Sequence, residues 1–248
     1  MLAADSLAIA LQPIVGLDSG RWVEVEALTR FPDGRAPDVW FAEAHEVGLG
    51  VDLEMAAVRA ALRTLGQLPE GVTLAVNASP QLILDPRLAR ALTAPGVPTA
   101  RIAVEMTEHA AVAHYEEIRQ VLAPLRALGL RVAVDDTGAG YSSFSHVLTL
   151  RPDVIKLDRS LVAGVDADPA RRAFITAVVL LALELGAEVT AEGVETASEQ
   201  LTLATLGVDR AQGYHLARPT TEARQWQTWR ARCWASAVPM PTGRLRVG

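Results

Sequence analysis

Cysteine, aromatic residues and runs of basic charge are all scarce in this sequence of 248 residues. Cys233 is the only cysteine, so an internal disulfide is impossible and a thiolate zinc cluster is excluded. The formal net charge is −6 and lysine and arginine form no run, which argues against binding to duplex nucleic acid or to an anionic membrane surface. With so little cysteine, a reducing cytoplasm is the location that we expect.

Hydrophobic segments long enough to cross a bilayer are also missing. The longest apolar run, residues 173–183, is too short to span a membrane and is followed by Glu184. The N-terminal segment has an acidic residue and no basic region, so we do not expect a signal peptide. Hydrophobic residues make up 50% of the chain, which is enough for one large core. We therefore predict one barrel domain over residues 1–236 and a flexible tail over residues 237–248.

Short β-rich segments alternate with longer helical patterns along the chain. We expect strands at residues 7–15, 22–31, 72–77, 101–106, 132–135, 154–157, 188–191 and 210–214. We expect helices at residues 38–47, 51–65, 80–92, 111–128, 142–148, 169–185, 195–206 and 222–234. This order favours an α/β fold, a (β/α)8 TIM-like barrel, over an open sheet. The first two strands read as a hairpin, which implies one antiparallel strand near the N-terminus.

Most of these strands carry or end in a polar side chain that can take part in chemistry. The carboxyl ends of parallel strands meet at one rim of a barrel, so we expect these side chains to gather there. Any one of them alone is more simply interpreted as a strand-end residue that faces solvent, but the whole set predicts a site. The set comprises Glu26, Asn77, Glu105, Asp135, Asp136, Lys156, Glu192 and Gln212.

The donor types in this set favour a hard divalent cation. Carboxylate and amide oxygens suit Mg²⁺ or Mn²⁺ and disfavour a soft metal. The set exceeds what one ion needs, so we expect two ions bridged by Asp135 or Asp136, an arrangement that suits phosphodiester hydrolysis. The plain alternative for the aspartate pair is a polar turn after a strand. Lys156 would face a water or a phosphate oxygen, or form a salt bridge to Asp153 or Asp158.

Two further features are interpreted as structural. None of the five histidines stands at one of these strand ends, so we interpret them as surface or packing residues. The sequence Gly138-Ala139-Gly140 does not complete a dinucleotide-binding fingerprint, because Ser143 stands where a third glycine is needed. It is more simply a flexible turn between a strand and a helix.

Short motifs along the chain form an ordered set. Glu26-Ala27-Leu28 is followed by Arg30. The other motifs are Gln12-Pro13-Ile14-Val15, Val76-Asn77-Ala78-Ser79, Glu105-Met106-Thr107-Glu108, Asp135-Asp136, Gly140-Tyr141-Ser142-Ser143, Lys156-Leu157-Asp158-Arg159-Ser160, Glu192-Gly193-Val194-Glu195-Thr196, Gln212-Gly213-Tyr214 and Arg218-Pro219. This set resembles the EAL-domain cyclic-di-GMP phosphodiesterases over almost the whole chain. Each tripeptide is a weak signal, but the ordered set is very specific.

The resemblance implies a (β/α)8 barrel that hydrolyses cyclic di-GMP to linear pGpG with Mg²⁺ or Mn²⁺. It implies one ion held by Glu26, Asn77, Glu105 and Asp135, and a second ion held or bridged by Asp136. It implies that Lys156, Glu192 and Gln212 position the attacking water, that Arg30, Gln12 and Leu28 bind substrate, and that Glu108 anchors the loop after Asp135.

One loop departs from the pattern of the family. Thr137 and Ala139 stand where the family usually has phenylalanine and threonine, in a loop that links metal occupancy to dimerisation. A homodimer is consistent with the resemblance. We predict an active phosphodiesterase. The alternatives are a weak or inactive receptor for cyclic di-GMP, which the altered loop favours, and a barrel phosphodiesterase for another substrate, which the lack of a histidine pair at the rim disfavours.

Overall fold

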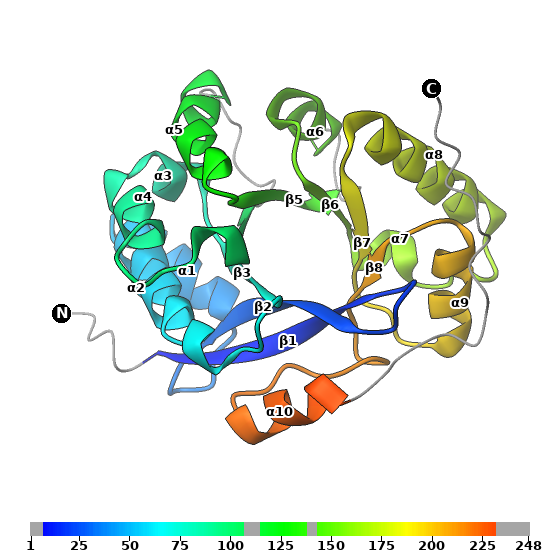
Figure 1. Ribbon diagram of the computed structural model, residues 1–248, viewed down its shortest axis with the longest axis horizontal. Coiled ribbons are helices and arrows are strands. Elements are labelled where there is room, and N and C mark those ends of the chain that lie inside the picture. The colour runs from blue at the N-terminus through cyan, green and yellow to red at the C-terminus, as the bar shows by residue number, and fades with distance from the viewer. Residues whose placement is uncertain (1–6, 107–114, 138–142, 232–248) are drawn as a thin grey trace.

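Eight strands close into a barrel in which each strand neighbours the next one along the chain (Figure 1). The computed structural model describes residues 7–106, 115–137 and 143–231. The strands are β1 (Ala8–Gly16), β2 (Trp22–Arg30), β3 (Thr73–Asn77), β4 (Ile102–Met106), β5 (Arg131–Thr137), β6 (Val154–Leu157), β7 (Glu188–Ala191) and β8 (Arg210–Ala211). β1 is antiparallel to β2 and β8, and the other neighbouring pairs are parallel. The predicted barrel with one antiparallel strand is therefore confirmed.

The helices surround the barrel wall on its outside (Figure 1). They are α1 (Pro37–Glu46), α2 (Gly50–Leu62), α3 (Pro80–Leu84), α4 (Pro86–Leu92), α5 (Tyr115–Ala127), α6 (Ser143–Leu150), α7 (Arg159–Val162), α8 (Pro169–Leu185), α9 (Ala197–Thr205) and α10 (Ala223–Ala231), with 3₁₀ turns at Leu65–Gln67 and Thr99–Arg101. α10 packs against the start of β2 through Trp229, whose ring meets Trp22 edge-on at 5.6 Å between centroids. Within the described ranges, no helix has both the length and the apolarity to cross a membrane.

The expected helix at residues 80–92 is wrong in one respect, because it is divided in two. Pro86 has no backbone N–H and disfavours a helical conformation at Asp85, so the first helix ends there. Ser79 caps α3 by accepting from the Leu82 N–H at 3.2 Å. Asp85 caps α4 by accepting from the Arg87 N–H at 2.8 Å. The last strand is also shorter than expected, since only Arg210–Ala211 pairs with its neighbours.

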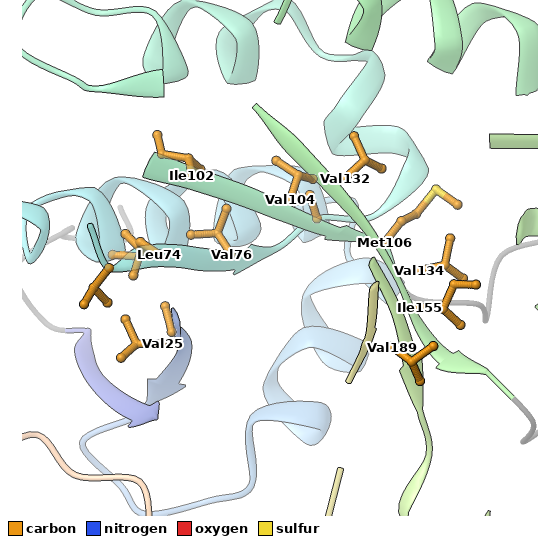
Figure 2. Close-up of a cluster of buried hydrophobic side chains, with 14 of the residues drawn as sticks. Val25, Leu74, Val76, Ile102, Val104, Met106, Val132, Val134, Ile155 and Val189 are labelled. Atoms are coloured by element: carbon orange, nitrogen blue, oxygen red, sulfur yellow. The ribbon is translucent and has the colours of Figure 1, made fainter. Parts of the chain in front are cut away.

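Successive residues of the wall strands belong alternately to the barrel interior and to the core beneath the helices. The outward residues join helix residues such as Leu82 and Ile175 in one hydrophobic cluster. The inward residues have the opposite parity and include buried alanines such as Ala75 and Ala103. Figure 2 shows part of the strand contribution to the core: Val25, Leu74, Val76, Ile102, Val104, Met106, Val132, Val134, Ile155 and Val189. The interior is thus left to small and polar side chains.

The end of the barrel where the parallel strands begin is closed by two acids and two arginines. Arg210 donates from Nη1 to Glu24 Oε2 at 3.0 Å. Arg210 and Arg131 both donate to Oε2 of Glu188. Burial raises the pKa of Glu24, although Arg210 and Arg131 act in the opposite direction. Charges of opposite sign are balanced at this end.

A capping box fixes the start of α9. Thr196 accepts from the Glu199 N–H at 3.1 Å, and Glu199 Oε2 accepts from the Thr196 N–H at 3.0 Å. The other oxygen, Glu199 Oε1, accepts from the Gly164 N–H at 2.9 Å. One carboxylate therefore ties the start of α9 to the segment between α7 and α8.

Candidate active site

Four carboxylates converge on one ammonium group at the mouth of the barrel, where the parallel strands end. The Nζ atom of Lys156 in β6 is 2.6 Å from Glu192 Oε1, 2.8 Å from Glu105 Oε2, 3.2 Å from Asp135 Oδ1 and 3.9 Å from Glu26 Oε2. These acids come from β2, β4, β5 and the residue after β7. The structure thus brings together side chains that are far apart in the sequence, as expected from their positions on the strands.

The alternative partners considered for Lys156 have other contacts. Asp153 accepts from Arg126 at 2.8 Å, and Asp158 accepts from the Ser160 N–H at 2.9 Å. Lys156 is 1% exposed and is the only lysine in the sequence. A lysine ammonium is a compact charge on a flexible stem, which suits a position surrounded by several carboxylates better than a planar guanidinium does. The presence of a single lysine is a sequence signal for this site that the motifs alone did not reveal.

The electrostatics of this cluster favour additional positive charge. Burial raises the pKa of Glu105 well above its usual range, against the attraction of Lys156. Burial also raises the pKa of Glu192 to about 8. Burial alone would lower the pKa of Lys156, but Asp135 and the three glutamates together raise it well above its usual value. One ammonium is therefore not enough to keep all of these acids ionised, and a bound cation would favour their charged forms.

The donor atoms fit a hard divalent ion. Glu105 Oε1 is buried and has no hydrogen-bond partner among the described residues. Asn77 donates a hydrogen bond from Nδ2 to Glu26 Oε1 at 3.2 Å. Its amide oxygen therefore points elsewhere and is the atom that could coordinate an ion. In the part of the chain that the structure describes, no three acidic, histidine or cysteine side chains are arranged as a complete metal site. The Nζ atom of Lys156 lies within 3.2 Å of Glu105, Asp135 and Glu192.

Gln212 lies beside these acids, directly after β8. Its Nε2 atom donates to Glu26 Oε2 at 2.7 Å and to Gln12 Oε1 at 3.1 Å. The next residue has to be glycine, because a Cβ on Gly213 would lie 2.1 Å from the carbonyl oxygen of Val194. This close approach lets the Val194 N–H donate to the Gln212 carbonyl at 3.0 Å, which fixes the backbone at the rim.

A cavity of about 830 Å³ opens next to the carboxylates, between β2, β3, α1 and α2. This volume lies within the range of small-molecule binding sites. The predicted substrate-binding residues Leu28 and Arg30 line it, and Arg30 donates from Nη1 to the Thr29 carbonyl at 2.9 Å. Three predicted metal ligands also line the cavity: Glu26, Asn77 and Asp135. The cavity therefore joins the candidate metal site to a space of substrate size.

One predicted site residue, Glu108, lies outside the described part of the structure. The predicted turn at residues 138–140 lies outside it as well. Asp136 belongs to β5, but its side chain is not described.

The structure adds one polar pair that sequence reasoning missed. Glu54 of α2 accepts from the Ser79 N–H at 3.0 Å, and its other oxygen lies 3.1 Å from His45 Nε2. Both side chains line the cavity. Gly50 makes room for the imidazole, since a Cβ there would lie 2.3 Å from His45 Nδ1. Glu54 thereby holds the segment that follows Asn77, two residues after the metal-ligand candidate.

Comparison with known proteins identifies the family. A model of the EAL domain matches residues 1–219. The cyclic di-GMP phosphodiesterase RocR of Pseudomonas aeruginosa is 33% identical over 222 residues, which cover 85% of this chain and 57% of that protein. The uncharacterized protein y4lL of Sinorhizobium fredii is 33% identical over 245 residues, which cover 96% of this chain and 30% of that protein. The chain therefore spans only part of the length of these relatives.

Solved structures agree with this result. BlrP1 of Klebsiella pneumoniae, in a complex with manganese and cyclic di-GMP, is 33% identical with a TM-score of 0.77, over 87% of this chain and 56% of that one. The EAL enzyme Bd1971, bound to cAMP and cyclic di-GMP, is 25% identical with a TM-score of 0.81, over 90% of this chain and 65% of that one. With its barrel, its motifs and these relatives, the chain belongs to the EAL domain family.

Proposed function

We propose that this chain hydrolyses cyclic di-GMP to linear pGpG with the help of Mg²⁺ or Mn²⁺. The observation that carries the proposal is the convergence of four carboxylates on Lys156 beside a cavity of about 830 Å³. The names of several relatives, including RocR and NbdA of Pseudomonas aeruginosa, describe cyclic di-GMP phosphodiesterases. Relatives in the same family have been solved in complexes with cyclic di-GMP.

The residues at the mouth divide into ligands and positioning groups. Glu26, Asn77, Glu105 and Asp135 would hold one ion, and Asp136 would hold or bridge to a second. Bound divalent ions lower the pKa of water and neutralise charge on the phosphate. This chemistry requires oxygen donors, and the unpartnered Glu105 Oε1 atom supplies one of them.

The remaining side chains would orient the reactants. Lys156 and Glu192, whose Nζ and Oε1 atoms are 2.6 Å apart, would position the attacking water, with support from Gln212. Arg30 would bind a substrate phosphate and Leu28 would contact the dinucleotide from the cavity wall. The water oxygen forms a bond to phosphorus, the P–O3′ bond breaks, and the O3′ oxygen leaves with a proton. Glu108 would anchor the loop after β5.

Chromatography of the reaction with cyclic di-GMP tests the proposal directly. We expect pGpG to form with Mg²⁺ or Mn²⁺ and not with EDTA. Glu26→Ala should abolish the reaction, whereas Glu116→Ala, at an exposed position of α5, should leave it unchanged. An unchanged substrate peak in all metal conditions would overturn the proposed hydrolysis.

The altered loop after β5 favours a second candidate, a receptor that holds cyclic di-GMP without cleaving it. Thr137 and Ala139 are the residues that differ from the usual family pattern. Equilibrium dialysis with labelled cyclic di-GMP, followed by chromatography of the bound material, separates the two functions. The receptor returns intact dinucleotide and the enzyme returns pGpG.

A further inference from the structure

Two glutamine side chains form a hydrogen-bonded series that starts at a backbone carbonyl and ends at the mouth of the barrel. Gln12 of β1 donates from Nε2 to the Ala217 carbonyl at 3.1 Å. Gln212 donates from Nε2 to Gln12 Oε1 at 3.1 Å and to Glu26 Oε2 at 2.7 Å. Gln12 is 7% exposed and Gln212 is 4% exposed, so both amides are shielded from bulk water.

The series has a fixed direction because a carbonyl oxygen can only accept. The Ala217 carbonyl requires the nitrogen end of the Gln12 amide, which turns Gln12 Oε1 toward Gln212. Gln212 must then present its own nitrogen, and the two hydrogens on that atom are used by Gln12 and Glu26. Gln212 Oε1 is left as a buried acceptor with no hydrogen-bond partner among the described residues.

The backbone around Ala217 supports this direction. Leu11, the neighbour of Gln12, exchanges two backbone hydrogen bonds with Thr220, at 2.9 and 3.0 Å. The Ala217 N–H donates to the Gly213 carbonyl at 3.0 Å. The segment that carries this carbonyl is therefore joined to β1 at Thr220 and to Gly213 at Ala217, independently of the two side chains.

We infer that Gln12 is a positioning residue, which acts on the reaction by holding the Gln212 amide with its oxygen available to the attacking water. This inference rests on the proposed hydrolysis. A buried acceptor needs a donor, and none of the described side chains donates to Gln212 Oε1, so a water molecule at the mouth is the fitting partner. That hydrogen bond leaves a lone pair of the water oxygen free for phosphorus. Both polar atoms of Gln12 bind groups inside the protein, and this positioning role is the alternative to the substrate contact expected from the sequence.

Steady-state kinetics of Gln12→Leu distinguishes the two roles. A positioning role predicts a kcat lower by about 10- to 100-fold with KM changed less than about threefold. Gln225→Leu, which removes an exposed glutamine of α10, is the control and should match the wild type. A substrate contact instead predicts a higher KM at unchanged kcat, and that result would overturn the inference.

A double-mutant cycle shows whether Gln12 acts through Gln212. If it does, Gln12→Leu should have no further effect on kcat in a Gln212→Leu background. Multiplying effects would mean that the two residues act separately, and the inference would be wrong.

Hydrogen exchange of the Gln212 side-chain amide tests the orientation without any turnover. In ¹⁵N-labelled protein, the Gln212 signals are those lost in Gln212→Leu, and both bonded protons should exchange slowly. Gln12→Leu should speed this exchange while circular dichroism stays unchanged, whereas Gln225→Leu should not. If the wild type fails to hydrolyse cyclic di-GMP, the proposed function fails, but this exchange still decides the orientation. Unchanged exchange in Gln12→Leu overturns the inference.

Discussion

The two ends of the barrel interior are both charged, but only one of them is balanced. At the end where the parallel strands begin, Glu24 and Glu188 face Arg131 and Arg210. At the mouth, four carboxylates surround Lys156. The balanced end pairs two acids with two bases, whereas at the mouth four acids share one base, and a bound cation would favour their ionised forms. Charge balance thus distinguishes the end of the barrel with paired charges from the end at which we propose that ions bind.

The two ends also use different bases. Arg210 reaches two acids from separate nitrogens, which suits a planar fork with several donors. Lys156 places one compact charge among acids on several strands. A guanidinium fixes the geometry of its partners, whereas an ammonium tolerates rearrangement when another cation enters.

The largest expected effect is on catalysis at the mouth. Glu26→Ala should lower kcat/KM for cyclic di-GMP at least about 10³-fold, because a proposed metal ligand and the partner of Gln212 are both lost. Thermal unfolding should show that the barrel still folds. Substantial turnover by this variant would show that the mouth is not the site of reaction.

The next effect is on stability at the opposite end. Arg210→Met leaves Glu24 and Glu188 without this arginine and should lower the free energy of unfolding by about 3–5 kcal/mol. Urea unfolding measures this loss. KM for cyclic di-GMP should be unchanged in the folded fraction. A large change in KM would show that the end of the barrel with Arg210 also affects substrate binding.

Divalent ions should stabilise the folded protein by binding at the mouth and not at the opposite end. An ion at 100 times its dissociation constant adds about 2.7 kcal/mol to the stability of a folded protein that binds it. Mn²⁺ should therefore raise the Tm of the wild type and of Arg210→Met, but not that of Glu26→Ala. An equal rise in Glu26→Ala would place the ion elsewhere.

The pH dependence of stability should also differ with and without metal. Burial raises the pKa of Glu192 from 4.5 to about 8, with repulsion from Asp135 and Glu26 adding to it and attraction by Lys156 opposing it. Because the folded state favours the protonated carboxyl, its contribution to stability is full below pH 4.5 and is lost as the pH rises toward about 8. In EDTA, the stability of the wild type should fall relative to Glu192→Gln between pH 5 and 8. Urea unfolding of both proteins checks this, and parallel curves would contradict it.

The smallest effect concerns a carboxylate outside both ends. Three backbone N–H groups outweigh the effect of burial and lower the pKa of Glu199. Its stabilisation is therefore present above the unfolded pKa and is lost as the pH falls through the folded one. Glu199→Gln should cost about 1 kcal/mol at pH 7, and the difference from the wild type should vanish in acid. A cost that stays constant down to pH 3 would rule out the charge as its cause.

The sequence predicts the barrel and much of the candidate site because both follow from short-range rules. Strand ends share a rim, so Glu105 and Lys156 could be expected to meet although they are 51 positions apart in the chain. The division of the helix at Pro86 was also visible in principle. The contact between Gln12 and Gln212 could not be predicted from the sequence, because it depends on how the first and last strands close the barrel. The support that Glu54 gives to Ser79 likewise depends on how α2 packs against β3.

Because the chain has a single lysine and that lysine is buried, proteolysis after lysine can be used to detect opening of the barrel. An endoprotease that cuts after lysine has one target bond here, between Lys156 and Leu157, and both residues lie inside β6. With Lys156 only 1% exposed, cleavage requires this strand to leave the barrel. At high protease concentration, the rate at which the chain is cut into two fragments therefore measures how often the closed sheet opens, with no label and no engineered site.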